Sequence, residues 1–240
     1  MNHSLNTDAW DSLEARIVAC RLCPRLVAWR EETARVKRRA YRDEEYWGRP
    51  VPGFGDRNAR LLIVGLAPAA HGGNRTGRFF TGDSSGDFLY AALYRAGFAN
   101  QPTARHRGDG LTLTDAYITA AARCAPPDNK PTPDELNNCR PYLAEEIALL
   151  DRVRVIVALG RVGYDAVLRV YEGRPGFAGR TALLKRFAHA AVVPLGAGPD
   201  AARLPVVVAS YHPSRQNTQT GRLTAAMFDR VWTMARELLD

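Results

Sequence analysis

Apolar residues along the chain fall into two alternating patterns. Four short apolar runs are typical of buried parallel strands and predict strands over residues 60–65, 115–120, 153–159 and 204–209. Elsewhere, apolar residues recur at helical spacing and predict helices over residues 8–18, 25–36, 87–96, 133–150, 162–171 and 224–238. Strands that alternate with helices predict a parallel sheet covered by helices on both faces.

Two unusual loops leave the carboxyl ends of the first and last predicted strands. They read GLAPAAHGGNRTGRFFTGDSSGD over residues 65–87 and SYHPSRQNTQTG over residues 210–221. Ligand sites in open parallel sheets form outside the carboxyl ends of the strands. We therefore expect the chemistry of this protein in these two loops.

The first loop is rich in glycine, which lets its backbone approach a ligand closely and present amide groups. It has neither the GK[ST] of a P-loop nor a GxGxxG fingerprint, so a nucleotide cofactor is disfavoured. Phe80, beside a glycine-rich turn, is placed to stack on a planar ring, whereas Phe79 is expected in the core. The polar side chains of this loop include His71, Asn74, Asp83 and Asp87.

The second loop places His212 directly after an apolar strand. A histidine there is able to donate a hydrogen bond to charge that develops on a substrate. The alternative is a structural histidine, which is the commoner role of a lone one. The polar residues that follow Pro213 are Ser214, Arg215, Gln216 and Asn217.

The charge of the chain favours a polyanionic partner such as nucleic acid. Its 33 Lys and Arg residues exceed its 25 Asp and Glu residues by 8, and the pI is about 9.6. Basic residues interleave with aromatic ones over residues 33–56, a mixture suited to a nucleic-acid backbone. The alternative for this stretch is a solvated helix face whose aromatic side chains point inward.

The N-terminus and the apolar runs disfavour export and a membrane span. The first ten residues are mainly polar, and the longest near-apolar run, residues 61–70, is about half of the roughly 20 residues that a membrane helix needs. We therefore expect a cytoplasmic protein. The ordinary globular composition predicts a single domain over residues 1–240, in which residues 1–58 form a helical, basic segment with the first cysteine pair.

The four cysteines form two pairs. Cys20 and Cys23 make a CxxC motif, and Cys124 and Cys139 bound the segment CAPPDNKPTPDELNNC. In a reducing compartment a four-thiolate metal site is favoured over disulfides, with unrelated buried thiols as the alternative. Zinc and iron-sulfur clusters both accept four thiolates. The long, proline-rich second segment slightly favours the larger cluster over a zinc ribbon.

Several of these motifs together resemble one known family. GLAPA at residues 65–69 and HPS at residues 212–214 look like the two signature motifs of the uracil-DNA glycosylase superfamily. The cysteine spacing is similar to that of its iron-sulfur members. With RCAPPDNKPTP at residues 123–133, the motifs match the type 5 (B-type) glycosylases closely, over roughly residue 20 to the C-terminus.

The resemblance implies a three-layer α/β/α sandwich with a central four-stranded parallel sheet, and a 4Fe-4S cluster bound by the four cysteines. It also implies a monomeric enzyme of base excision repair that flips uracil out of DNA and hydrolyses it from deoxyribose. Its partner would be double- or single-stranded DNA that contains deaminated bases.

The resemblance also implies roles for individual residues. Phe80 falls where relatives place the aromatic residue that stacks on uracil, and His212 where they place the histidine that faces the uracil O2. Asp83 matches the polar group that acts on water in type 5 enzymes, and Asn129 is a candidate to help hold that water, with a turn role as the alternative. The other implied residues lie around the base, at Gly65, Ala67, Asn74 and Ala120, or at the tip of the second loop that wedges into DNA, at Ser214, Arg215, Gln216 and Asn217.

Three positions depart from the better-known branches of the family. Ala67 stands where the most familiar branch has a catalytic aspartate, and Leu66 where the thermophilic iron-sulfur branch has glutamate. Ala120 replaces the asparagine that reads uracil in both. Without that reader we expect bases such as hypoxanthine to be excised as well. For Asp87 we expect only a helix N-cap.

Two other functions remain open at this point. One is a non-catalytic iron-sulfur protein of the same fold that binds DNA or RNA. The other is a glycosylase-like protein that becomes covalently trapped on DNA.

Overall fold

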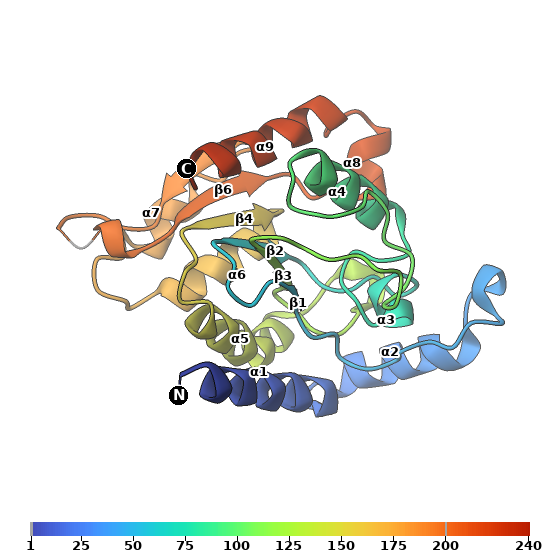
Figure 1. The fold of residues 1–240 in the computed structure, drawn as a ribbon. Helices are drawn as coiled ribbons and strands as arrows, with labels where there is room; N and C mark the ends of the chain where they lie inside the picture. The colour runs from blue at the N-terminus through green and yellow to red at the C-terminus, as the bar shows by residue number, and fades with distance from the viewer. Residues whose placement is uncertain (1, 200) are drawn as a thin grey trace.

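The computed structural model describes residues 2–199 and 201–240, with side chains from residue 7 onward. At its centre lies one six-stranded sheet with the strand order β1-β3-β2-β4-β6-β5 (Figure 1). The strands are β1 (Phe54–Gly55), β2 (Leu61–Gly65), β3 (Ala116–Ala120), β4 (Val155–Leu159), β5 (Ala191–Pro194) and β6 (Val206–Ser210).

The four predicted strands form the parallel centre of this sheet, in the order β3-β2-β4-β6. Three of them, β2, β3 and β4, are fully buried, as expected for strands covered on both faces. The expected four-stranded sheet is extended by β1 and β5, which pair antiparallel at its two edges. Sequence patterns miss these edges because the strands have two and four residues and are partly exposed.

Helices cover both faces of the sheet. They are α1 (Asn2–Ala19), α2 (Pro24–Val36), α3 (Gly73–Thr76), α4 (Ser84–Arg95), α5 (Pro133–Leu149), α6 (Arg161–Tyr171), α7 (Arg180–Leu184), α8 (Arg215–Gln219) and α9 (Ala225–Glu237), with 3-10 turns η1 (Arg39–Tyr41), η2 (Pro127–Asn129) and η3 (Ala201–Arg203). Within the described part of the chain, no helix is long and apolar enough to cross a membrane.

Alternate residues of each central strand face opposite layers. In β2, Leu61 and Ile63 pack with α4 and α9, whereas Leu62 and Val64 pack with α1, α5 and α6. Figure 1 shows α4 and α9 on one side of the sheet and α1, α5 and α6 on the other. The fold is therefore the expected three-layer α/β/α sandwich.

The helix after the glycine-rich loop begins earlier than predicted, at Ser84. Its N-cap is Asp83, whose carboxylate accepts a hydrogen bond of 2.9 Å from the Gly86 amide. The expectation that Asp87 is the N-cap is therefore wrong, because Asp87 lies in the first turn with its side chain exposed.

A buried ion pair ties α5 to the end of β3. Arg123 and Glu146 are each 1% exposed, and Arg123 donates from both terminal nitrogens to the Glu146 carboxylate at 3.0 and 2.5 Å. The Thr119 hydroxyl also donates to this carboxylate, at 2.6 Å. This ion pair holds α5, which carries Cys139, against the segment after β3, which carries Cys124.

Candidate active site

The carboxyl end of β2 carries the first part of the site. Gly65, its last residue, is aligned with Ala120 at the end of β3, and the buried side chain of Ala120 is 1% exposed. A Cβ atom on Gly65 would lie 2.8 Å from Cζ of Phe80, so only glycine allows the ring to come this close. Phe80 itself has a left-handed backbone with φ 52°.

His212 follows β6 and approaches the same ring. The ring centroids of Phe80 and His212 are 5.9 Å apart, with an interplanar angle of 31°. Asn217 fixes the backbone there, since its amide nitrogen donates to the His212 carbonyl at 2.9 Å and its backbone amide to the Ser214 hydroxyl at 3.3 Å. The structure therefore brings together Gly65, Phe80 and His212 from two loops far apart in the sequence.

The environment of His212 keeps its ring neutral. Burial lowers its pKa from 6.5 to about 4. A neutral imidazole carries one N–H donor, which is able to stabilise negative charge that develops on a leaving group without first losing a proton.

Asp83, in the same glycine-rich loop, lines a cleft that Phe80 and His212 do not line. A Cβ atom on Gly72 would lie 1.9 Å from its carboxylate oxygen Oδ2, so the carboxylate packs directly against this glycine. Burial raises its pKa, against backbone hydrogen bonds from Gly86 and Ser85 that lower it. Asp83 lines a surface cleft of about 470 Å³ together with Asp87, Arg75, Arg105, His106 and five further residues, which do not include Phe80 or His212.

The basic, aromatic stretch packs onto the glycine-rich loop through Arg75, a residue that no sequence pattern indicated. Arg75 pairs with Glu44, and its guanidinium lies 3.9 Å from the centroid of the Tyr41 ring. The buried Tyr46 shares a hydrogen bond of 3.0 Å with Nδ1 of His71. Tyr46 is buried and Tyr41 and Trp47 are partly buried, so the aromatic side chains pack toward the protein. Beyond α2, however, the stretch is a 3-10 turn and loop and not the helix face of the alternative. Its exposed side chains include Arg38, Arg39, Arg42 and Arg49.

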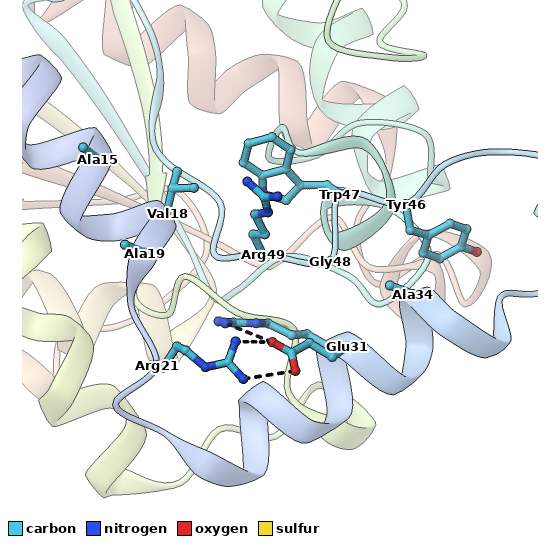
Figure 2. Close-up of a pocket in the computed structure, with 11 residues that line it drawn as sticks. Ala15, Val18, Ala19, Arg21, Glu31, Ala34, Tyr46, Trp47, Gly48 and Arg49 are labelled. Carbon is cyan, nitrogen blue, oxygen red and sulfur yellow. Dashed lines mark hydrogen bonds and ion pairs between the residues drawn. The ribbon is translucent and has the colours of Figure 1, made fainter.

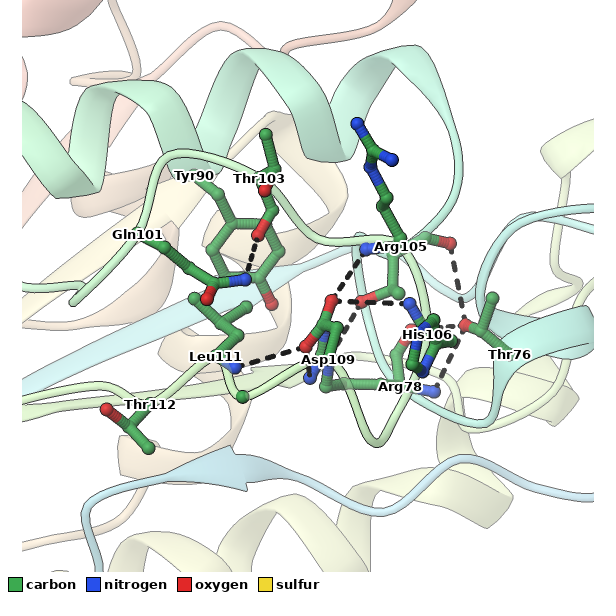
Figure 3. Close-up of polar contacts among 12 residues, drawn as sticks. Thr76, Arg78, Tyr90, Gln101, Thr103, Arg105, His106, Asp109, Leu111 and Thr112 are labelled. Atoms are coloured by element: carbon green, nitrogen blue, oxygen red, sulfur yellow. Dashed lines mark hydrogen bonds and ion pairs between the residues drawn. The ribbon is translucent and has the colours of Figure 1, made fainter.

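A second buried network surrounds Arg78 and Asp109, just before Phe80 in the chain (Figure 3). Arg78, next but one before Phe80, forms two hydrogen bonds to Asp109 at 2.9 and 2.7 Å and a third to the Thr81 hydroxyl at 2.9 Å. Burial tends to raise the pKa of Asp109, but hydrogen bonds from Arg78 and from backbone amides, including that of Arg105, hold it below its usual range. Phe79, 1% exposed, lies in the core as predicted.

The other predicted base-contacting and water-holding residues differ in exposure. Asn74 is 1% exposed, and its amide nitrogen donates to the carbonyls of Arg30 at 3.2 Å and Ala70 at 3.4 Å. It therefore joins α3 to α2, and a contact with substrate stays a prediction. Ala67 is partly exposed just beyond β2, and Asn129 is exposed in η2 with φ 56°.

The predicted DNA-facing residues lie at the start of α8. Ser214 is its N-cap, and Arg215 and Gln216 are exposed in its first turn. Of the four residues, Ser214 and Asn217 thus shape the loop, while the side chains of Arg215 and Gln216 are open to a partner.

All four cysteines are free thiols that line one narrow cavity. Cys20 follows α1, Cys23 precedes α2, Cys124 follows β3, and Cys139 lies in α5. Burial raises the pKa of Cys124 to about 11 and that of Cys139 to about 12. A bound cation would relieve this penalty on the thiolate forms.

Two side chains donate hydrogen bonds to these sulfur atoms. Arg30 donates to Sγ of Cys124 at 2.8 Å, and Asn138 to Sγ of Cys23 at 3.4 Å. In residues 2–199 and 201–240, no group of three or more His, Cys, Asp or Glu side chains is arranged to hold a metal ion.

The low pKa of His212 predicts how stability depends on pH. Between pH 6.5 and about 4 the unfolded chain takes up a proton at His212 and the folded protein does not, so stability falls as the pH is lowered through this range. We expect His212→Gln to remove this loss, which is at most about 3 kcal/mol. Urea unfolding of both proteins at pH 7, 6 and 5 measures it, and a difference in stability that stays constant with pH would contradict the burial of a neutral ring.

Known proteins resemble this chain over most of its length. The profile of the uracil DNA glycosylase superfamily matches residues 52–236. The type-5 uracil-DNA glycosylase of Mycobacterium tuberculosis is 54% identical over 94% of this chain and 80% of its own length, and that of Thermus thermophilus is 53% identical over 92% and 94%. The type-5 enzyme of Pyrobaculum aerophilum is 46% identical over 92% and 90%. The chain therefore belongs to the uracil DNA glycosylase superfamily.

Proposed function

We propose that the protein is a monofunctional DNA glycosylase that extrudes uracil from DNA and hydrolyses its N-glycosidic bond, in base excision repair. The observation that carries this proposal is the group formed by Gly65, Phe80 and a neutral His212 at the carboxyl ends of β2 and β6. An aromatic ring for stacking and a neutral donor for a base oxygen are what excision of a planar base requires.

The reaction places opposite charges on the two halves of the nucleotide. As the bond breaks, the sugar becomes cationic and the departing base anionic. The ring of Phe80 would stack on the extruded base, and the N–H of His212 would donate to its O2. Because His212 is already neutral at pH 7, this hydrogen bond forms without a change of protonation.

The carboxylate of Asp83 is our candidate for the sugar side. Its burial supports the choice, because a desolvated carboxylate interacts more strongly with a cation than a solvated one does. It would orient or activate the attacking water and stabilise the sugar cation, with Asn129 helping to hold that water. Ala67 and Leu66 offer no such group at the neighbouring positions.

Access to the base requires that the nucleotide leaves the DNA stack. Unpairing and unstacking cost a few kcal/mol, least at a mismatch. The exposed Arg215 and Gln216 would fill the vacated space, and exposed arginines such as Arg38 and Arg39 would contact phosphates of double- or single-stranded DNA.

Substitution of Asp83 tests the catalytic assignment. Asn is as good an N-cap as Asp, so Asp83→Asn should keep α4 intact while it removes the charge. We expect single-turnover excision of uracil to slow by about 10² to 10³, with DNA binding retained.

The matched control is Asp87→Asn, one turn further on and lining the same cleft. Asn129→Ala tests the proposed second water contact and should slow excision less than Asp83→Asn does. A near-normal rate for Asp83→Asn, together with a large loss in Asp87→Asn, would transfer the role to Asp87. A near-normal rate in all the variants would mean that another group acts on the sugar side. No excision by the wild type, with DNA binding that does not need the Asp83 and His212 side chains, would favour a non-catalytic DNA-binding protein. An adduct with DNA that survives denaturation would instead indicate covalent trapping.

We also propose that the four cysteines bind one 4Fe-4S cluster with a structural role. The residues fit it, because the donor set is four thiols around one cavity, with N–H donors aimed at two of the sulfur atoms. Four thiolates also suit a zinc ion, and the long, proline-rich segment between Cys124 and Cys139 favours the larger cluster. When bound, the cluster would supply a rigid cross-link between α1, α2, β3 and α5.

Metal analysis tests the cluster. Anaerobically purified protein should be brown and contain about four irons and four sulfides per chain. Cys139→Ala should lose iron and solubility before excision chemistry is affected in the folded fraction. Stoichiometric zinc without iron would overturn the assignment.

The range of substrates follows from Ala120. A methyl group cannot pair with both edges of uracil, and a site without a hydrogen-bonding filter rejects analogues weakly, whereas a dedicated filter discriminates by about 10⁴ or more. We expect measurable excision of hypoxanthine, and His212→Ala should slow the excision of every accepted base. Single-turnover rates on duplexes that differ only in the lesion measure this. Activity confined to uracil at excess enzyme would mean that another residue reads the base.

A further inference from the structure

Arg30 of α2 is a buried cation beside the cysteines. Its side chain is 2% exposed, and it lines both the narrow cysteine cavity and a larger surface cleft of about 680 Å³. Figure 2 shows this cleft between the end of α1, α2 and the segment from Tyr46 to Arg49. Arg30 thus forms the wall that separates the cysteines from the cleft.

The hydrogen bonds of Arg30 point toward the cysteines. One terminal nitrogen donates to Sγ of Cys124 at 2.8 Å and the other to the Cys20 carbonyl at 3.2 Å, while the buried Nε has no hydrogen-bond partner. In the described residues, six buried side-chain polar atoms lack a hydrogen-bond partner. Two of them are the Nε atoms of Arg30 and Arg123, the two arginines that line the cysteine cavity.

The charge of Arg30 is poorly matched by carboxylates. Its ion pair with Glu31 is 3.8 Å long, and Glu31, 45% exposed, is already held by both terminal nitrogens of Arg21 (Figure 2). Arg123 provides the contrast, because it lies at the same cavity and is neutralised by the fully buried Glu146.

A guanidinium does not deprotonate in proteins, and an ionised group is buried only when it is paired. We propose that the missing partner is the metal-thiolate group itself, so that Arg30 is its counter-charge and its cover on the cleft side. This inference rests on the proposed cluster. Arg30 acts through Cys124 and is a positioning residue, not a catalytic one.

Two measurable consequences follow from this arrangement. Removing a residue that hydrogen-bonds to a metal ligand typically weakens metal binding by about 10- to 100-fold. A cation beside an anionic cluster also favours the reduced, more negative state, so loss of the cation should lower the reduction potential.

The test compares Arg30→Met with Arg21→Met in the full-length, cluster-loaded protein. Arg21 lies on the same cleft but is exposed and paired with Glu31, which makes it the matched control. With an iron chelator in air, loss of visible absorbance should be about 10- to 100-fold faster in Arg30→Met than in wild type, and within about twofold of wild type in Arg21→Met. Equal rates in the two variants would overturn the inference.

A second measurement covers the case in which Arg30→Met does not fold. Arg30→Lys keeps the charge and Arg30→Gln keeps an N–H donor without it. In redox titrations followed by electron paramagnetic resonance, Arg30→Lys should stay near the wild-type potential and Arg30→Gln should fall below it. The same potential in both would overturn the role of the charge.

The metal content of the wild type separates this inference from the cluster proposal. If the wild type holds zinc, the cluster proposal fails. The role of Arg30 is then decided by comparing zinc loss from Arg30→Met with zinc loss from Arg21→Met, and equal losses would overturn it. If it binds no metal, both proposals fail.

Discussion

The ring of Phe80 lies against the α-carbon of Gly65, and the candidate active site is arranged around this contact. It requires a residue without a side chain at the end of β2 and a left-handed backbone at Phe80. A glycine in a strand and a left-handed backbone at a phenylalanine are each unfavourable on their own. Phe80 keeps its conformation because the segments on both sides of it are fixed, by Arg78 on Asp109 before it and by the N-cap of Asp83 after it.

The same loop is connected to the cysteines through one helix. Asn74 donates to the carbonyl of Arg30, while the side chain of Arg30 donates to Cys124. Helix α2 therefore lies between the glycine-rich loop and the cysteine cavity and contacts both. A cross-link at the cysteines would hold α2 in place and, through α2, one wall of the candidate active site. Such a cross-link would be useful without any electron transfer, which hydrolysis of an N-glycosidic bond does not need.

Burial affects histidine and arginine differently in these two sites. His212 responds to burial by staying neutral, which suits a hydrogen-bond donor to a base oxygen. Arg30 is unable to respond in this way, since its guanidinium stays ionised. The fold therefore has to supply an anion beside Arg30, and Sγ of Cys124, which Arg30 contacts, would be one in a metal-thiolate group.

The sequence by itself determined the parallel centre of the sheet, its two cover layers and the loops that carry the site, because continuous apolar runs and helical periodicity are local signals. It also singled out Gly65, Phe80, His212 and the four cysteines. Only the tertiary structure decided which loop residues meet. It made Asp83 rather than Asp87 the N-cap, buried Asn74 against α2, and brought Arg30 to Cys124 across 94 residues of sequence. Such pairings depend on how helices pack on the sheet, and no local pattern in the chain records them.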